Sequence, residues 1–300
     1  MRHAALALAL TTAPLAAQSA DEIEAARQAF HEGHHALALT VLIPAAEAGD
    51  AVAQNTYAIA LGDGLGVPVD GTAAVEMFEK SMAQGNLKAM HNLAHHYHYG
   101  AKGVPADPAK ALTLYEEAIA KGYKAAGAGL GRLYANGLGV EADPARAAEL
   151  YAMGAEAQEP NAAYNLANAY RTGTGVAEDP AKALALYTEA GLLGNGLAWN
   201  ALGLMFEYGM GTEANNEAAF LAYREAINAD VALAGINAGL FVTAKEGPWQ
   251  DPVEGYGYCL WGINNAAEDD RETFIQQCEA LVEYLSVEEE DAAKRFAEGL

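Results

Sequence analysis

Histidines cluster in one stretch of the chain with a spacing that suits metal binding. His91, His95 and His98 stand at positions i, i+4 and i+7, which places them on one face of a helix if the stretch is helical. Imidazoles that converge in this way can ligate zinc. No carboxylate or cysteine stands at a spacing that would complete the site. The three histidines are therefore weak metal candidates, and the alternative is that they line a surface for a partner.

The other residues do not suggest catalysis. The chain has no Gly-x-Ser-x-Gly segment that would present a serine nucleophile, and serine is scarce. The many Asp and Glu residues are spread along the chain instead of forming a pair for acid–base work. The Gly-x-Gly pairs follow predicted helices and not strands, which argues against a phosphate-binding loop. We therefore predict a protein that is not an enzyme and has no cofactor.

Five copies of one pattern set the positions of these residues. The fullest copy consists of Ala126, Leu130, Gly131, Tyr134, Gly137, Gly139, Val140 and Asp143. The leading alanines are Ala53, Ala89, Ala126, Ala162 and Ala198, so the period is 36 or 37 residues. A period of this length indicates stacked supersecondary units, each of which contacts its neighbours.

Each copy predicts two helices joined by a short glycine turn. Ala126, Leu130 and Tyr134 recur at i, i+4 and i+8, the spacing of one helix face. Gly137 can end that helix in the left-handed conformation. Asp143 and Pro144 then supply an N-cap and a first-turn proline for a second helix. Small residues such as Gly131 would let the two helices approach closely.

These residues resemble the Sel1-like repeats, which are relatives of the tetratricopeptide repeats. The resemblance covers five copies in residues 50–229 and implies an all-α fold, a right-handed α-solenoid of about seven helix pairs with a C-terminal helical cap. It also implies a role in protein–protein interaction. Around the repeats we expect a degenerate helical pair at 18–49, a divergent repeat at 230–267 and capping helices at 268–300. Cys259 and Cys278 could bridge the last hairpin to the cap or stay reduced.

The first 17 residues have the layout of a secretory signal peptide. Arg2 precedes an apolar stretch from Ala4 to Leu10, and small residues lead up to Ala17. This predicts secretion across the inner membrane, to the periplasm of a bacterium, and the stretch is too short to span a membrane. The net charge of −23 disfavours nucleic acid as a partner. It would attract a basic patch on a partner protein, or it only keeps the repeats soluble.

The repeat period also predicts where a partner would bind. Positions reached from His91, His95 and His98 by whole periods change residue type from copy to copy, whereas the alanine, leucine and tyrosine positions do not. In solenoids of helix hairpins the first helices line the concave surface, so we expect a polar groove there that binds a protein or peptide. The expected members, here called the groove set, are His91, His95, His98, Arg132, Tyr164, Asn168, Arg171 and Asn200.

These observations favour an exported adaptor or regulator that binds another protein. Two other functions remain open from the sequence. One is a periplasmic metal-binding protein that uses the histidine cluster, and the other is a cell-wall-associated accessory factor or hydrolase.

Overall fold

In the computed structural model of this chain, the described residues are 18–244, 251–283 and 285–300. The predicted signal segment lies outside them. The described part is built from helices, and its one β-type interaction is an isolated bridge between Ala101 and Val104. It divides into a first unit that ends at Tyr123 and a second unit, Lys124–Leu300. Among the helices described, none has the length and hydropathy needed to cross a membrane.

The first unit holds three helix pairs: α1 (Ala20–His31) with α2 (His35–Glu47), α3 (Ala51–Asp63) with α4 (Gly71–Ala83), and α5 (Leu87–Tyr99) with α6 (Pro108–Ala120). The second unit begins with the 3-10 turn η1 (Lys124–Ala126) and contains α7 (Gly127–Asn136), α8 (Pro144–Glu156), α9 (Pro160–Thr172), α10 (Pro180–Leu192), α11 (Gly196–Tyr208), α12 (Asn216–Asn228), α13 (Ala232–Ala244), α14 (Pro252–Asn265), α15 (Glu268–Val282) and α16 (Val287–Glu298).

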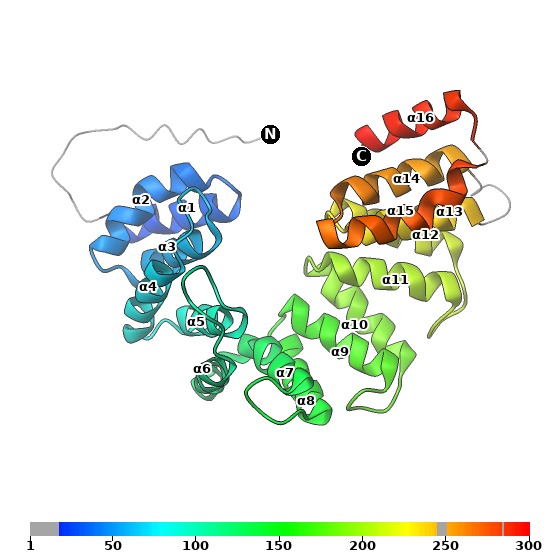
Figure 1. The fold of residues 1–300 in the computed structure, drawn as a ribbon. Helices are drawn as coiled ribbons and strands as arrows, with labels where there is room; N and C mark the ends of the chain where they lie inside the picture. Colours follow the sequence, from blue (N-terminus) through cyan, green and yellow to red (C-terminus); the bar gives the residue numbers. More distant parts are fainter. Residues whose placement is uncertain (1–17, 245–250, 284) are drawn as a thin grey trace. The chain divides into compact units, whose positions relative to one another are not determined.

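From α1 to α6 and from α7 to α15, helices that follow one another in the sequence pack side by side, and α16 packs on α14 (Figure 1). The two helices of a pair form a hairpin, and the second helix packs on the first helix of the next pair, as α8 does on α9. First helices of neighbouring pairs also touch, as α7 and α9 do. The predicted all-α solenoid of helix hairpins is confirmed, with seven pairs among the described residues before α15 and α16.

The predicted capping residues form the helix ends. The side chain of Asp143 accepts a hydrogen bond from the backbone N–H of Arg146 at 3.0 Å, and Asp107 and Asp179 cap α6 and α10 in the same way. Gly137 ends α7 with φ of +66°, a conformation that glycine adopts without steric cost. The first helix of this repeat differs from the others, because Ala126 provides no side-chain cap and the helix begins as a 3-10 turn.

A row of tyrosines explains why small residues recur in the first helices. Tyr115, Tyr151, Tyr187 and Tyr223 stand 36 residues apart on the second helices and are buried. A Cβ atom added to Gly131 would lie 2.6 Å from the Tyr151 ring, and one added to Gly203 would lie 2.3 Å from the Tyr223 ring. A larger side chain at either glycine would displace the ring, so the glycines are required for hairpin packing.

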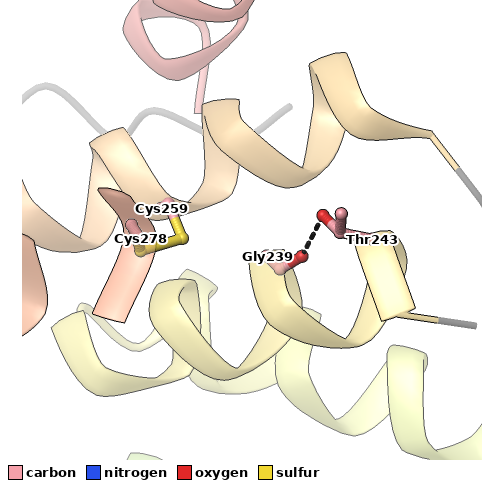
Figure 2. Close-up of a disulfide and its surroundings, with 4 residues drawn as sticks. All are labelled: Gly239, Thr243, Cys259 and Cys278. Carbon is pink, nitrogen blue, oxygen red and sulfur yellow. Dashed lines mark hydrogen bonds between the residues drawn. A yellow bond between two sulfur atoms is a disulfide. The ribbon is translucent and has the colours of Figure 1, made fainter. Parts of the chain in front are cut away.

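The C-terminal end of the second unit is held by a disulfide and by aromatic packing. Cys259 of α14 and Cys278 of α15 form a disulfide with their Cα atoms 6.2 Å apart, and both are buried. Figure 2 shows this bond beside α13, where the Thr243 hydroxyl donates to the Gly239 carbonyl at 2.8 Å. Phe296 places α16 on α14, because its ring lies 5.0 Å from that of Tyr258. The last hairpin is therefore covered by α15 and α16.

Candidate functional site

A polar cluster in the second unit surrounds the hydroxyl of Tyr187. The ring of Tyr187 is buried between α9 and α10, and its hydroxyl donates to Asn168 Oδ1 at 2.7 Å. The Nε–H of Arg171 donates to the same hydroxyl oxygen at 3.1 Å. The Tyr164 ring lies against the Tyr187 ring, with centroids 5.7 Å apart. The structure thus brings Tyr164, Asn168 and Arg171 of the predicted groove set together around one buried side chain, and we call these four residues the Tyr187 cluster.

The Tyr187 hydroxyl keeps its proton in this environment. Burial raises the pKa of Tyr187 above its ordinary value of 10.0, and the bond and positive charge of Arg171 only partly oppose this effect. A protonated hydroxyl donates one hydrogen bond and accepts another, as the two contacts above require. Asn168 is held further, since its Nδ2 donates to the Tyr164 carbonyl at 3.2 Å. The cluster is therefore a fixed arrangement of polar groups that leaves Arg171 exposed and Tyr164 half-buried.

A hollow of about 220 Å³ opens next to this cluster, between α7, α8 and α9. It is lined mainly by Ala135 of α7, by Ala147 and Tyr151 of α8, and by Asn165, Asn168 and Ala169 of α9. We call this space the Ala135 hollow. The positions equivalent to Ala135, separated by 36 or 37 residues, carry Gly62, His98, Arg171 and Glu207. Ala135 has a methyl group where the second, fourth and fifth repeats have a longer polar side chain, which leaves the space open.

Asn165 is the polar group of the hollow that stays available. Its side-chain amide makes no hydrogen bond within the described part of the chain, and the residue is partly exposed. The neighbouring Thr172 hydroxyl is already used, because it donates to the Asn168 carbonyl at 2.9 Å. A free primary amide can donate to one group and accept from another at the same time. The hollow therefore offers one donor–acceptor pair in a lining that also contains alanine methyl groups.

The expectation of a groove position was wrong for Asn200. Asn200 is buried and its Oδ1 accepts from Asn237 Nδ2 at 2.8 Å, which joins α11 to α13. Asn92 and Asn55 make the same contact between α5 and α3 in the first unit, at 2.9 Å. These amides satisfy one another between two first helices, so Asn200 belongs to the packing of neighbouring repeats and not to the surface.

Arg132 is exposed on α7, one repeat period before Asn168. It does not belong to the Tyr187 cluster, although Ala135 of the hollow follows it by one helical turn. Arg132 therefore remains a member of the proposed binding face on its position in the repeat.

Of the three predicted histidines, His98 is buried and His91 is partly buried, contrary to the expectation that they face solvent. The ring of His91 lies between Tyr115 and Tyr123, with centroid distances of 5.5 and 5.6 Å. His98 is 6% exposed and stacks on Tyr99 at 4.1 Å. His95 is exposed, and its ring centroid lies 4.6 Å from that of Tyr99. Tyr115 of α6 and Tyr123, which follows α6, cover His91, whereas His95 and His98 contact Tyr99 at the end of α5 itself.

Burial also determines the charge of His91. It lowers the pKa of His91 from 6.5 to about 4, with a smaller contribution from the neighbouring charge of His95. No group of three His, Cys, Asp or Glu side chains with metal-binding geometry occurs among the residues that the structure describes. The histidine cluster therefore reads as aromatic packing of the first unit.

The expectation that the chain contains no His-Glu-x-x-His segment was wrong. Residues 31–35 read His-Glu-Gly-His-His, which fits the H-E-x-x-H pattern of zinc proteases, where both histidines must share one helix face. Here α1 ends at His31, Gly33 has φ of +86°, and α2 begins at His35. The two histidines lie on different helices, so the geometry that this motif needs is not formed. The sequence signal that decides this is the glycine inside the motif.

The fold defines a helical-repeat protein. Its hairpins share one set of packing residues, and other positions vary from repeat to repeat. The Sel1 repeat model matches residues 51–86, 87–123, 126–158, 160–195 and 198–230, which is more than half of the chain. The chain belongs to the Sel1 repeat family. Proteins of this family are typically protein-interaction modules, and no catalytic family is indicated for this chain.

Solved structures with the same fold come from several bacteria. A Sel1 repeat protein from Oxalobacter formigenes is 22% identical with a TM-score of 0.61, over 88% of this chain and 97% of that chain. A protective antigen of uropathogenic Escherichia coli is 21% identical with a TM-score of 0.49, over 92% and 67%. An immunity protein from Pseudomonas aeruginosa is 23% identical with a TM-score of 0.46, over 77% and 81%. The first of these likenesses supports the fold alone. No curated protein sequence matches this chain significantly.

Proposed function

We propose that this protein is an exported, non-enzymatic adaptor or regulator that binds a partner protein or peptide through the first-helix face of its second unit. The observation that carries the proposal is the Tyr187 cluster, in which three variable positions of α9 are held in place by a buried hydroxyl. Groups that are already ordered lose little conformational freedom when a partner binds. A face prepared in this way is suited to recognition.

The residue types in the cluster are those that dominate protein interfaces. Tyrosine and arginine are enriched among the side chains that carry most of the binding energy. Tyr164 offers a half-buried ring that is supported from below by Tyr187, and Arg171 offers the part of its guanidinium that does not bind the Tyr187 hydroxyl. The cluster has no nucleophile beside a general base, so binding is the chemistry that it supports.

The composition of the chain supports export and a preference among partners. The N-terminal segment has the layout of a signal peptide, and the buried disulfide between Cys259 and Cys278 suits an oxidising compartment such as the periplasm. A net charge of −23 would speed the encounter with a partner that carries a basic patch. Nucleic acid and anionic membrane surfaces would be repelled.

Affinity capture tests this function. The tagged mature chain, residues 18–300, is used to capture proteins from a periplasmic extract, beside the double variant Tyr164→Ala/Arg171→Ala. Asn168 is left in place because it holds the Tyr187 hydroxyl. The control double variant Tyr208→Ala/Arg146→Ala removes the same two residue types from exposed positions outside the cluster.

We expect a partner that the unaltered chain and the control retain and that the cluster variant loses. Equal capture by all three forms would place binding elsewhere on the chain. If the unaltered chain captures no specific partner, the proposed adaptor function is contradicted.

A further inference from the structure

We infer that the Ala135 hollow receives one apolar side chain from an extended polypeptide segment that carries an acidic residue next to it. This inference rests on the proposed function, since it names what the first-helix face of the second unit would recognise. Four observations carry it: the size of the hollow, its lining, the free amide of Asn165 and the charges at its edge.

The volume of the hollow limits what can occupy it. Pockets for whole small molecules or cofactors usually measure about 300–1,000 Å³ and enclose most of the ligand. The Ala135 hollow, at about 220 Å³, is smaller and is open to solvent on one side. A single side chain of a larger partner fits these dimensions better than a separate metabolite does.

The lining selects an apolar side chain. Ala135, Ala147 and Ala169 present methyl groups, and Tyr151 adds a ring. None of the described residues that line the hollow is Asp, Glu, Lys or Arg. A charged side chain placed there would lose water without gaining an ion pair, which is costly. A leucine, isoleucine, methionine or phenylalanine would instead gain roughly 1.5–3 kcal/mol from burial in such a space.

The side-chain amide of Asn165 favours a polypeptide backbone next to the bound apolar side chain. Its amide has both a donor and an acceptor without partners in the described part of the chain. The backbone of an extended peptide presents an N–H and a C=O that match this pair. One residue of a bound segment could therefore place its side chain in the hollow and exchange backbone hydrogen bonds with Asn165.

The charges at the edge favour an acidic neighbour. Arg132 stands one helical turn before Ala135 on α7, and Arg171 stands one turn after Asn168 on α9. Both are exposed. The second unit is otherwise strongly acidic, with ten basic and twenty-seven acidic residues in 124–300, so Arg171, which is hydrogen-bonded to the lining residue Asn168, is a local exception. Arginine forms strong, charge-assisted hydrogen bonds with carboxylates, and an acidic residue in the segment would meet this charge.

The residue at position 135 distinguishes the third repeat from the others. At the equivalent positions three other repeats have His98, Arg171 and Glu207, and the first repeat has Gly62, where an added Cβ atom would meet the His96 ring. Glu207 accepts from the Tyr223 hydroxyl at 2.8 Å, and His98 is packed against Tyr99. Side chains occupy that space in these repeats, whereas Ala135 leaves it open. Ala135 is therefore the residue that would determine which segment binds.

Selection from a random twelve-residue peptide library displayed on phage tests this inference with residues 18–300 as the target. Peptides that are enriched are then synthesised and titrated against three forms: the unaltered chain, Ala135→Trp, which fills the hollow, and Ala109→Trp, which adds the same ring to an exposed alanine of α6. Thermal unfolding of both variants is measured to check that they are folded. The double variant Tyr164→Ala/Arg171→Ala is titrated in parallel.

We expect enriched peptides to share a large apolar residue beside Asp or Glu, to lose roughly tenfold or more in affinity for Ala135→Trp, and to bind Ala109→Trp unchanged. Exchange of the acidic residue for its amide should weaken binding to the unaltered chain and have no effect on the arginine variant. Peptides that depend on Tyr164 and Arg171 but bind Ala135→Trp normally would overturn the inference and leave the proposed function intact. A selection that enriches no peptide would count against both.

Discussion

Tyr115 of α6 and Tyr187 of α10 occupy the same place in their hairpins, and both are buried, but their surroundings differ. The Tyr115 ring meets His91 and His98 at centroid distances of 5.5 and 6.3 Å, inside the first unit. The Tyr187 hydroxyl instead binds Asn168 and Arg171, which reach the surface of the second unit. One framework therefore supports two kinds of face. The variable positions decide whether the first helix is covered by aromatic packing or exposes ordered polar groups.

The largest expected effect tests whether the framework is the same in both units. Leu93 of α5 and Leu130 of α7 are repeat equivalents that are 1% and 3% exposed. Replacing either by alanine should lower the free energy of unfolding by about 2–5 kcal/mol, because a buried leucine leaves a cavity. Urea unfolding followed by far-UV circular dichroism measures the loss. A small effect at one position and a large effect at the other would show that the two units pack by different rules.

Acid should destabilise the first unit, because it protonates His91. The pKa of His91 is about 4 in the folded chain against 6.5 for the unperturbed side chain, so the unfolded state binds the proton more readily. The stabilisation is complete above pH 6.5 and is lost as the pH falls through about 4, by up to roughly 3 kcal/mol. Burial lowers the pKa of His96 as well, so part of the effect in this window belongs to that residue.

Urea unfolding at pH 7 and pH 4.5 measures this loss, with His91→Phe as the variant that keeps a ring between Tyr115 and Tyr123. Tryptophan fluorescence serves as an internal comparison, since all three tryptophans follow residue 198 and report on the second unit. If His91→Phe loses as much stability in acid as the unaltered chain, His91 is not the group that titrates.

The smallest expected effect concerns the Tyr187 cluster itself. Tyr187→Phe keeps the ring and removes the hydroxyl that binds Asn168 and Arg171. A net cost of about 0.5–1.5 kcal/mol is expected for these hydrogen bonds, together with weaker capture of the partner because Arg171 is no longer held. The measurement combines thermal unfolding with the capture experiment. Unchanged capture in a folded variant would mean that the fixed arrangement is not what the partner recognises.

The sequence predicted the hairpins well because their signals are local. The period of the alanines, the aspartate caps and the turn glycines each act within a few residues, and the structure has all of them where the repeat requires them. The tyrosine row and its facing glycines were also readable as a packing pattern, although the contact between Gly131 and Tyr151 joins different helices.

The candidate site could be predicted from the sequence only in part. Helical spacing shows that His91, His95 and His98 share a face, but it does not show how much of that face the next helix covers. The structure leaves His95 exposed, buries His98 and partly covers His91, because Tyr115 and Tyr123 approach from outside the helix. For the same reason Asn200 became a buried contact to Asn237. The separation of 37 residues in both asparagine pairs was the signal in the sequence.

The sequence by itself determined the all-α repeat architecture, the family and the positions of the variable residues, since helix periodicity and caps depend on neighbours along the chain. Tertiary structure decided which variable residues are accessible, which of them gather around Tyr187, and where a hollow remains. These properties depend on side chains that are 16 to 37 residues apart and meet only when the hairpins stack. A small residue such as Ala135 acquires a role only through the space that its neighbours leave around it.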